Sequence, residues 1–426
     1  MRSPGIKIGV ISDHASPLAS PGSTDAGGQN VYVAHIARQL AGMGHEVDVF
    51  TRREDPTLPR VQSLCDGASV HNIAAGPPTR ISKDDLLPYM ARFTDEVEAA
   101  CTDGGHDVVH ANFWMSGLVA AAIKRRTGIP FAITFHALGK IRRTEQGGAD
   151  GSPDLRIPIE EHIVREADRI IAECPQDVTD LLELYGADPT RISLVPAGFD
   201  PAEFGPVDRD AARRRLGLPT DGFVVLHLGR LVPRKGIAEL IEGFARFRVR
   251  SAVGREATLV IVGGHPSDPA SRDERMRLAS IAEHHGITDA VRFEGLVCRE
   301  GLRDYYGAAD VFATTPWYEP FGITPLESMA CGTPVLGSRV GGIPYTVRDG
   351  VTGWLVPPRD PGAIADRLGW IGDRRHDLGR FRAAAVRHVH ASFRWADVGE
   401  QLDAVLREVV PREAAASGRL AVEAAS

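Results

Sequence analysis

Two glutamates flank a segment whose composition suits the binding of an anionic ligand. Seven residues separate Glu319 from Glu327, and Pro320 and Gly322 within that span predict an irregular loop. Pro325 suits the first turn of a helix, so we expect Glu319 to precede the helix and Glu327 to lie on its first turn. Taken alone, such a pair is more often one solvated carboxylate and one that complements the helix dipole. The surrounding proline and glycine residues favour a ligand site instead.

The backbone at this helix start is a second group that could bind an anion. The first N–H groups of a helix have no partner within it, and the helix dipole favours negative charge at that end. The amides of Phe321, Gly322 and Ile323 are therefore candidates to hold a phosphate.

A basic loop earlier in the chain supplies charges of the opposite sign. Arg230, Arg234 and Lys235 lie between a predicted strand at 223–229 and a helix that begins near Ile237. A planar guanidinium and a compact ammonium both suit a diphosphate, and they would neutralise negative charge on a departing group. A solvated basic loop explains this cluster equally well when it is considered alone.

Two weaker signals lie in the first half of the chain. Gly27 and Gly28 open a predicted helix, where the backbone could approach a sugar or a phosphate closely. His136 follows a predicted strand at 131–134 and could donate a hydrogen bond to a sugar hydroxyl. His110 also ends a strand, so position alone does not choose between the two histidines, and a structural role is as good an explanation for either.

Several motifs of other enzyme classes are absent. No G-x-G-x-x-G follows a predicted strand, and the chain has no G-x-x-x-x-G-K-[ST] segment. The triplet Asp208-Arg209-Asp210 precedes a helical stretch, so we interpret Asp208 or Asp210 as a helix cap rather than a metal ligand. We therefore expect no metal and no cofactor.

Strands and helices alternate along the chain and place these motifs at strand ends. Each half predicts an α/β domain with a doubly wound parallel sheet. A segment rich in proline, glycine and aspartate at 196–219 predicts the linker, and a last helix is expected over 395–409. The predicted strands are 6–12, 46–51, 107–110, 131–134, 169–172 and 191–196 in the first half, and 223–229, 258–262, 291–294, 311–314 and 334–337 in the second.

Composition argues against several classes of protein. The 426 residues favour two domains, and the net charge of −7 argues against a nucleic-acid partner. The five cysteines are scattered, which argues against a disulfide framework or a zinc site and favours the cytoplasm. A strand begins within a few residues of the N-terminus, and no apolar run is long enough to span a membrane, so we expect neither a signal peptide nor a transmembrane segment. The sequence leaves a homodimer open.

In combination, these motifs resemble the retaining glycosyltransferases of family 4, which have the GT-B fold. The resemblance runs from about residue 5 to residue 410 and rests on several motifs in the right order. It implies two Rossmann-like domains that face each other across a cleft. The implied parts are an acceptor-binding domain at 1–203, a nucleotide-sugar-binding domain at 204–394 and a helix at 395–410 that crosses back to the first domain. The alanine-rich composition of 411–426 predicts a disordered tail.

The resemblance also implies a role for each matching residue. Arg230 and Lys235 would bind the donor diphosphate, and Glu327 would bind the ribose. The implied catalytic residues are His136, Glu319, Arg230 and Lys235. The implied donor-binding residues are Gly28, Arg230, Lys235, Glu319, Phe321, Gly322, Ile323 and Glu327. The implied reaction is a metal-independent front-face substitution, in which the departing phosphate oxygen takes the acceptor proton and no side chain acts as nucleophile.

Two branches of the family share further segments with this chain: the sucrose and sucrose-phosphate synthases, and the mycothiol glycosyltransferases. The implied acceptor-binding residues are Gly27, Gly28, Asn30, Lys83, Phe113 and Arg156. Lys83 and Arg156 match basic acceptor-phosphate positions of the mycothiol branch, but Phe113 and Ala137 replace a tyrosine and a threonine that bind the phosphate there. Each lost hydroxyl removes a hydrogen bond of about 1 kcal/mol or more. This weakens the case for inositol phosphate and leaves another phosphorylated sugar or a specialised metabolite open.

The sequence thus predicts transfer of a hexose-type sugar from a UDP- or GDP-linked donor to a small polar acceptor, with or without a phosphate. Two alternatives remain at this point. An epimerase or hydrolase of the same fold would consume the nucleotide sugar without an added acceptor. A non-catalytic nucleotide-sugar-binding protein would bind the donor and release no nucleotide.

Overall fold

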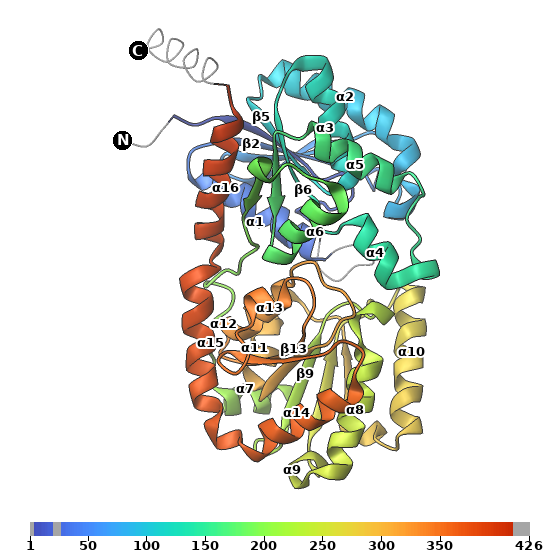
Figure 1. Cartoon of the computed structure of the whole chain (residues 1–426), viewed down its shortest axis with the longest axis vertical. Helices are drawn as coiled ribbons and strands as arrows, with labels where there is room; N and C mark the ends of the chain where they lie inside the picture. The colour runs from blue at the N-terminus through green and yellow to red at the C-terminus, as the bar shows by residue number, and fades with distance from the viewer. Residues whose placement is uncertain (1–3, 20–26, 412–426) are drawn as a thin grey trace. The chain divides into compact units, whose positions relative to one another are not determined.

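A computed structural model describes residues 4–19 and 27–411 of the chain. These residues form two compact units. The first contains residues 4–19, 28–196 and 395–411, and the second contains residue 27 and residues 197–394. Figure 1 shows the first unit in blue to green, together with the red helix α16 (Trp395–Val409), and the second in yellow-green to orange. The tail expected at 411–426 lies almost entirely outside the described residues.

The first unit is built on an eight-stranded sheet with the order β3-β4-β2-β1-β5-β6-β7-β8. All of its neighbouring strands are parallel except β3 and β4, which form an antiparallel hairpin at one edge. The strands are β1 (Lys7–Ile11), β2 (Glu46–Arg52), β3 (Val61–Cys65), β4 (Ala68–Ile73), β5 (Val108–Asn112), β6 (Phe131–Thr134), β7 (Arg169–Ala172) and β8 (Ile192–Leu194). The helices, besides α16, are α1 (Gly28–Gly42), α2 (Met90–Gly104), α3 (Trp114–Thr127), α4 (Gly139–Gln146), α5 (Arg156–Glu166) and α6 (Pro175–Tyr185).

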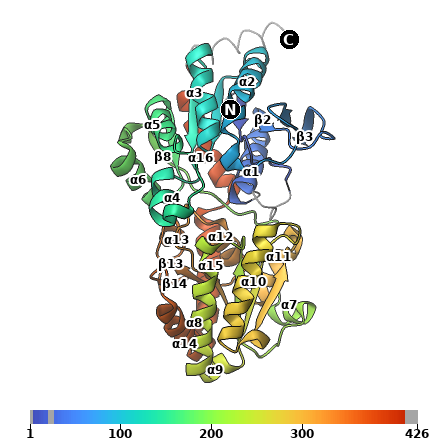
Figure 2. The ribbon, with the colours of Figure 1, turned by 90° about the vertical axis from the view of Figure 1, so that its right-hand side faces the viewer.

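The second unit is built on a six-stranded parallel sheet with the order β11-β10-β9-β12-β13-β14. Its strands are β9 (Val224–Leu228), β10 (Thr258–Val262), β11 (Val291–Gly295), β12 (Val311–Thr314), β13 (Val335–Ser338) and β14 (Gly353–Val356). Its helices are α7 (Arg209–Leu216), α8 (Ile237–Arg250), α9 (Ala252–Arg255), α10 (Pro269–His284), α11 (Arg299–Ala308), α12 (Ile323–Ala330), α13 (Ile343–Thr346), α14 (Pro361–Asp373) and α15 (Leu378–Ser392). Helices α8 and α10 pack side by side, as Figure 2 shows, and α12 packs against α15.

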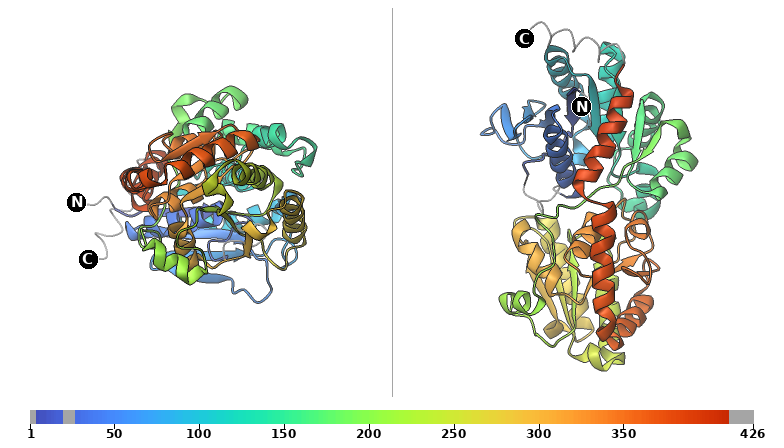
Figure 3. Two further views of the ribbon diagram at one scale, coloured as in Figure 1. Left: turned by 90° about the horizontal axis from the view of Figure 1, so that it is seen from below. Right: turned by 90° about the vertical axis from the view of Figure 1, so that its left-hand side faces the viewer.

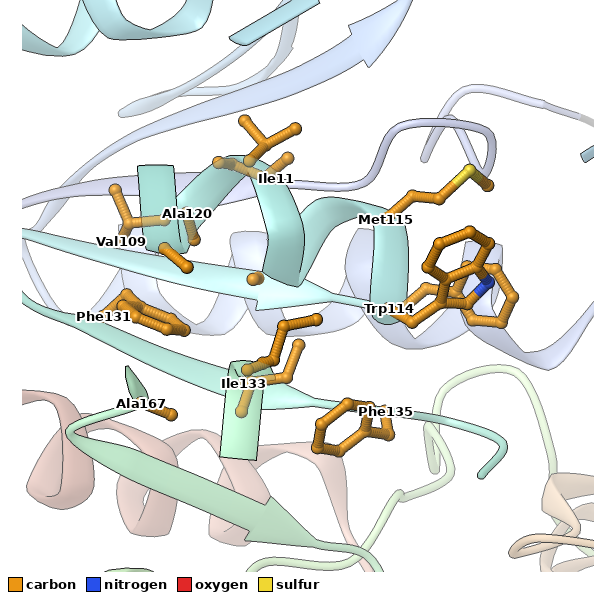
Figure 4. Packing of buried hydrophobic residues seen from close by; sticks show 14 of the residues in the cluster. Ile11, Val109, Trp114, Met115, Ala120, Phe131, Ile133, Phe135 and Ala167 are labelled. Atoms are coloured by element: carbon orange, nitrogen blue, oxygen red, sulfur yellow. The ribbon is translucent and has the colours of Figure 1, made fainter. Parts of the chain in front are cut away.

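Continuous apolar runs form the central strands because both faces of each sheet are covered by helices. In β6, Phe131 and Ile133 are fully buried and belong to the same apolar cluster as Trp114, Met115 and Ala120 of α3 (Figure 4). Parallel strands that are covered on both faces lose the alternation of apolar and polar residues, which explains why they appear in the sequence as short apolar blocks. Gly117 lets α3 approach closely, since a Cβ there would lie 2.9 Å from the side chain of Ile163 on α5.

The sequence predicts most of these elements and misplaces some. Strands β6, β7, β10 and β12 and helix α16 have the predicted bounds. The hairpin of β3 and β4 was not predicted, because the residues of β3 are exposed or half-buried and form no apolar block. The segment expected to be the linker, 196–219, contains helix α7, so the extended linker is shorter than predicted. The cap assignment is confirmed: the side chain of Asp208 accepts a hydrogen bond from the N–H of Ala211 at 2.6 Å.

Helix α16 packs along α1 in the first unit (Figure 3). Its first residue, Trp395, is 2% exposed, and its ring stacks on that of His35 with 5.0 Å between ring centroids. Gly399 permits the close approach of the two helices, because a Cβ there would lie 2.6 Å from the Cβ of Gln39. None of the helices among residues 4–19 and 27–411 combines the length and apolar character needed to cross a membrane.

This contact predicts that Gly399→Ala destabilises the first unit. The added methyl group must push α16 away from α1, which typically costs about 1–3 kcal/mol for an overpacked site. Gly379→Ala on α15 is the matched control, since a Cβ there would have no atom within 4 Å and the residue is exposed. It should be neutral or stabilising by up to about 1 kcal/mol. Urea unfolding followed by circular dichroism compares the two, and equal midpoints would contradict the tight packing of α16 on α1.

Candidate active site

The second sheet brings the two predicted donor-binding segments together at its switch point. The strand order reverses between β9 and β12, and open α/β sheets bind ligands beyond the carboxyl ends of the strands at such a point. The basic loop that begins at Gly229 follows β9, and the loop that contains Glu319 follows β12. Lys235 and Glu319, which are 84 residues apart in the sequence, therefore lie on neighbouring loops of one unit.

Lys235 and Glu319 form a direct ion pair between these loops. The ammonium of Lys235 contacts Oε2 of Glu319, and the two side chains are only 16% and 13% exposed. Arg234 lies 3.9 Å from the same carboxylate oxygen and donates to the carbonyl of Tyr318 at 3.1 Å. The geometry therefore places two positive charges against one carboxylate, and Arg230 belongs to the same loop.

Burial and charge act in opposite directions on the two partners. Burial lowers the pKa of Lys235, and the positive charges of Arg234 and Arg230 act in the same direction. The negative charge of Glu319 opposes them and raises this pKa. Burial alone would raise the pKa of Glu319, but Lys235 and Arg234 hold that pKa below its ordinary value. Glu319 is therefore ionised at neutral pH and can orient the ammonium of Lys235 toward an anionic ligand.

Glycines hold these loops close to one another. Gly236 ends the basic loop with φ +65°, and a Cβ there would lie 1.9 Å from the carbonyl oxygen of Thr315. Gly341 has φ +51°, and its Cβ would lie 1.8 Å from the carbonyl oxygen of Glu319. The N–H of Gly342 donates to that same oxygen at 3.3 Å. Gly341 and Gly342 were not among the predicted site residues, although a Gly-Gly pair shortly after the predicted strand at 334–337 was an available signal.

Helix α12 begins earlier than predicted, so Glu327 does not lie where it was expected. Gly322 turns the chain into the helix with φ +91°, so the amides of Phe321, Gly322 and Ile323 lie at the helix start. Glu327 is the fifth residue of α12 and therefore belongs to the second turn, since the helix starts at Ile323 rather than nearer to Pro325. The prediction of a first-turn position was wrong.

Two partners from α11 hold the Glu327 carboxylate in a buried position. The hydroxyl of Tyr306 donates to Oε2 at 2.9 Å, and Nη1 of Arg299 donates to Oε1 at 3.2 Å. Glu327 is 3% exposed, and burial raises its pKa, which Arg299 opposes. Arg299 also donates to Glu203 at 2.5 Å. No sequence motif pointed to Tyr306 or Arg299.

In the first unit, the strand order reverses between β1 and β5, and several predicted residues lie near that point. Gly28 starts α1, which follows β1, and Gly27, which belongs to the second unit, precedes it in the chain. Gln29, which was not among the predicted site residues, donates to Oγ of Ser12 at 3.3 Å and to the carbonyl of Asn112 at 3.2 Å. These contacts join the residues after β1 to the end of β5.

Asn30 and Lys83 have different environments in the same unit. Asn30 is 3% exposed and donates to the carbonyl of Ser16 at 3.0 Å, so it helps to hold the loop after β1. Lys83 is half-buried and begins the short helix η1 (Lys83–Asp85).

His136 is held by partners on both ring nitrogens. Its backbone has φ +56°, which is uncommon for a residue with a side chain. Nδ1 lies 3.1 Å from Oε2 of Glu173, and Nε2 lies 3.0 Å from Oδ1 of Asn112. The ring also packs edge-on against Tyr32, with 4.8 Å between centroids. The ring orientation is therefore fixed, and the side chain retains 10% exposure.

His136 and His110 have different environments in the structure. His110 is fully buried, and its Nε2 lies 2.9 Å from the hydroxyl of Thr134. Burial, together with the nearby His136, lowers the pKa of His110 to about 3, so it stays neutral. His110 therefore has a structural role, while His136 lies at a strand end and keeps some contact with solvent.

Phe113 and Arg156 contact each other near the carboxyl ends of β5 and β6. Phe113 has φ +85° and precedes α3, and the guanidinium carbon of Arg156 lies 5.1 Å from the centre of its ring. Arg156 is 1% exposed and donates from Nε to Glu160 at 2.7 Å. Its Nη2 donates at 2.5 Å to the carbonyl of Ala137, the residue that directly follows His136 in the chain.

All five cysteines are free thiols. Within the part of the chain that the structure describes, no group of three histidine, cysteine, aspartate or glutamate residues is arranged to hold a metal ion.

A small pocket beside His136 is lined by two carboxyl groups, those of Glu173 and Asp177. The N–H of Glu173 donates to Oδ2 of Asp177 at 3.0 Å. Burial and the negative charge of Glu173 raise the pKa of Asp177 to about 8. Aspartate in an unfolded chain has a pKa near 4. Between about pH 4 and pH 8 the folded state therefore binds more protons than the unfolded state, and the contribution of Asp177 to stability falls as the pH rises.

Asp177→Asn should remove this dependence. We expect the melting temperature of the variant, relative to the natural protein, to rise progressively from pH 5 to pH 9, because the natural chain must ionise a partly buried carboxyl group over that range. Differential scanning calorimetry at several pH values measures the difference. A difference that stays constant with pH would show that the pKa of Asp177 is not raised.

Two protein-family models match the chain. Residues 27–198 match the model described as a glycosyl transferase 4-like domain, and residues 208–386 match the model of glycosyl transferases group 1. The D-inositol 3-phosphate glycosyltransferase of Acidothermus cellulolyticus is 41% identical over 424 residues, which cover 97% of this chain and 93% of the relative. D-inositol 3-phosphate glycosyltransferase 2 of Catenulispora acidiphila is 39% identical over 393 residues, with 91% and 92% covered.

Solved structures agree with these matches. Sucrose-phosphate synthase from Thermosynechococcus elongatus superimposes with a TM-score of 0.88 at 32% identity, covering 95% of this chain and 98% of the other. HepE of Anabaena superimposes with a TM-score of 0.74 at 20% identity, covering 95% and 100%, and shows the shared fold alone. The switch-point geometry, both family models and these relatives agree: the chain belongs to the family 4 glycosyltransferases and has their GT-B fold.

Proposed function

We propose that this glycosyltransferase moves a hexose-type sugar from a UDP- or GDP-linked donor to a small polar acceptor, without a metal and with retention of the anomeric configuration. The observation that carries the proposal is the ion pair of Lys235 and Glu319 at the switch point of the second unit. A diphosphate needs positive charge that is already oriented, and this pair provides it beside the start of α12.

Each predicted donor residue has a role in this proposal. Arg230 and Lys235 neutralise the diphosphate, and the helix-start amides of Phe321, Gly322 and Ile323 bind its oxygens or those of the sugar. Glu319 orients Lys235 and accepts a hydrogen bond from a sugar hydroxyl.

The buried Glu327, fixed by Tyr306 and Arg299, accepts hydrogen bonds from the ribose hydroxyls. Its two oxygens each have one protein partner and retain lone pairs for a ligand. The proposed donor-binding domain is the predicted 204–394 segment, and the proposed acceptor-binding domain is 1–203.

In the proposed reaction, an acceptor hydroxyl attacks the anomeric carbon on the face from which the phosphate departs. The bond between the anomeric carbon and the phosphate oxygen breaks, and the new carbon–oxygen bond forms on the same face. The departing phosphate oxygen takes the proton of the hydroxyl, so no side-chain base or nucleophile is needed. His136, whose ring Glu173 and Asn112 hold in place, contacts the sugar near the reacting carbon.

The acceptor side of the proposal rests on the first unit. Gly27, Gly28 and Asn30 lie at the start of α1, where the backbone can approach a hydroxylated ligand. The proposed acceptor surface also includes Lys83, Phe113 and Arg156. The name that the relatives share, D-inositol 3-phosphate glycosyltransferase, supports a small polyhydroxylated acceptor that carries a phosphate.

Lys235→Ala and Glu319→Ala should each cripple transfer without unfolding the protein. Loss of one group that stabilises a departing anion typically lowers kcat about 100- to 1,000-fold. Glu242→Ala on α8 is the matched control, since it removes a carboxylate from the same unit at a 37% exposed side chain. Nucleotide release from a donor and acceptor mixture gives kcat, and circular dichroism checks the fold. Full activity in either site variant would refute the assignment.

The stereochemical outcome can be observed directly. With an α-linked donor, proton NMR of the reaction mixture in EDTA should show an α-linked product from the first turnover, because front-face substitution retains the configuration. A β-linked first product would exclude the proposed mechanism. A donor that disappears equally fast without acceptor would indicate a hydrolase or an epimerase.

A further inference from the structure

Resting on the proposed function, we propose that His136 is an imidazolium, with a proton on each ring nitrogen, and that Glu173 is the positioning residue that keeps it so. The charged ring then stabilises the negative charge that develops on the departing phosphate. The evidence is the set of hydrogen-bond partners around the ring, all of which belong to the first unit. Neither Glu173 nor Asn112 was among the site residues predicted from the sequence.

Both ring nitrogens of His136 face hydrogen-bond acceptors. Nδ1 lies 3.1 Å from Oε2 of Glu173, and an ionised carboxylate can only accept. Nε2 lies 3.0 Å from Oδ1 of Asn112. A neutral imidazole donates from one nitrogen only, so it could satisfy just one of these two contacts. Both contacts are hydrogen bonds when each nitrogen carries a proton.

A third contact fixes the orientation of the Asn112 amide. Its Nδ2 donates to the carbonyl of His110 at 3.3 Å, so the amide oxygen is the atom that faces His136. A flipped amide would place two oxygens, its own and that of the His110 carbonyl, against each other. The amide assignment therefore follows from the hydrogen-bond network. Asn112 is fully buried, so water cannot replace the bond that a flip would lose.

Glu173 supplies the negative charge that balances the second proton. Its side chain is 6% exposed and that of His136 is 10% exposed, so little water is available to stabilise either charge alone. An opposite charge at hydrogen-bond distance favours the charged form of such a group. Burial and the charge of Glu173 raise the pKa of Asp177 to about 8, so Asp177 is mostly protonated at neutral pH. Glu173 is therefore the carboxylate that pairs with the ring.

Two further titratable groups lie beside the ring. Tyr32 packs edge-on against it with 4.8 Å between ring centroids, and burial raises the pKa of its hydroxyl, so Tyr32 stays uncharged. Burial, together with the charge of His136, lowers the pKa of His110 to about 3, so His110 also stays uncharged. Neither group therefore takes the place of Glu173 as the partner of a charged ring.

Glu173 acts through His136 rather than on the ligand. The pocket that Glu173 and Asp177 line leaves room for no more than about one water molecule, so a sugar cannot reach this carboxylate there. Both N–H groups of His136 bind protein acceptors, so the ring acts through its charge. In the proposed reaction, negative charge grows on the departing phosphate oxygen near the carbon that His136 contacts, and a fixed positive charge stabilises it.

Nuclear magnetic resonance can count the protons on the ring. The natural protein and a His136→Gln variant are labelled with nitrogen-15 in the histidine rings, and long-range proton–nitrogen spectra are recorded at neutral pH. The signals that the variant lacks belong to His136. We expect both of its ring nitrogens to have the chemical shift of a protonated nitrogen. A ring with one protonated and one unprotonated nitrogen would overturn the proposal.

Glu173→Gln tests the cause. Glutamine has nearly the same shape and still accepts a hydrogen bond, but it carries no charge, so His136 should keep only one proton. Asp48→Asn on β2 is the matched control, because the Asp48 oxygens also pair with histidines of the first unit, at 2.9 Å from His71 and 3.1 Å from His106. This control should leave the His136 signals unchanged. Two protons on His136 in Glu173→Gln would refute the role of Glu173. If that variant is unfolded by circular dichroism, the spectrum of the natural protein decides.

A double-mutant cycle shows whether Glu173 acts through His136. Glu173→Gln should lower kcat about 100-fold, because a group that stabilises the departing anion is lost. It should leave the Kd of the nucleoside diphosphate unchanged, since the proposed diphosphate ligands belong to the second unit. The variant that carries both Glu173→Gln and His136→Gln should be no slower than His136→Gln alone, because residues that act as a unit are not additive. Asp48→Asn should retain the natural kcat. Losses that multiply in the double variant, or a natural kcat in Glu173→Gln, would contradict the proposed role.

Failure of this inference is distinguishable from failure of the proposed function. A neutral His136 in the natural protein overturns the imidazolium and leaves the proposed sugar transfer intact. Absence of nucleoside diphosphate binding, in contrast, refutes the proposed function, and the spectrum still decides the charge of the ring.

Discussion

The buried contact between the ammonium of Lys235 and the carboxylate of Glu319 is the interaction on which the proposed donor site depends. An ion pair that has lost most of its water is stable only if both charges stay matched, and removal of one partner leaves the other uncompensated. The contact requires the loops after β9 and β12 to lie side by side, which the strand order of the second sheet ensures. It also requires the backbone oxygen of Glu319 to approach residue 341, and only glycine fits there. In the proposed donor site, the pair keeps the ammonium of Lys235 oriented toward a diphosphate.

The first unit shows a different constraint, which is backbone strain at strand ends. Among the described residues, three that are not glycine have positive φ: Phe113, His136 and Arg359. Such a conformation costs about 1–3 kcal/mol and persists only where the surroundings fix it. Phe113 and His136 follow β5 and β6 closely, and both were selected from the sequence as site residues. Their strain is held by the packed core beneath them and by the contacts of His136 with Glu173 and Asn112. Strain at these two positions supports the view that the edge of the first sheet is shaped for a ligand.

The sequence predicts the alternation of strands and helices well because buried parallel strands are short apolar blocks. It also predicts that the basic loop and Glu319 follow strands. Because the carboxyl ends of parallel strands meet at the same edge of a sheet, both segments are then expected at that edge. It could not predict the depth at which a side chain is buried. Glu327 was placed on the first helical turn, but the helix starts earlier, at Ile323, and the carboxylate points into a buried pair of partners on α11. Arg156 was matched to an acceptor-phosphate position through the family resemblance, whereas its pairing with Glu160 depends on the packing of α4, α5 and α6. Gly341 was missed since its role depends on a contact with a residue far away in sequence.

The central claim is that the second unit holds a nucleoside diphosphate by protein charges alone, and a thermal-shift panel tests it most directly. The protein is heated with UDP, GDP, ADP, NAD or AMP, each once with EDTA and once with magnesium. A ligand that binds the folded state raises the melting temperature, and a concentration 100 times the Kd stabilises by about 2.7 kcal/mol. We predict that UDP or GDP stabilises selectively and that EDTA does not change the shift. Stabilisation by NAD alone, or by a nucleotide only in the presence of magnesium, would contradict this claim.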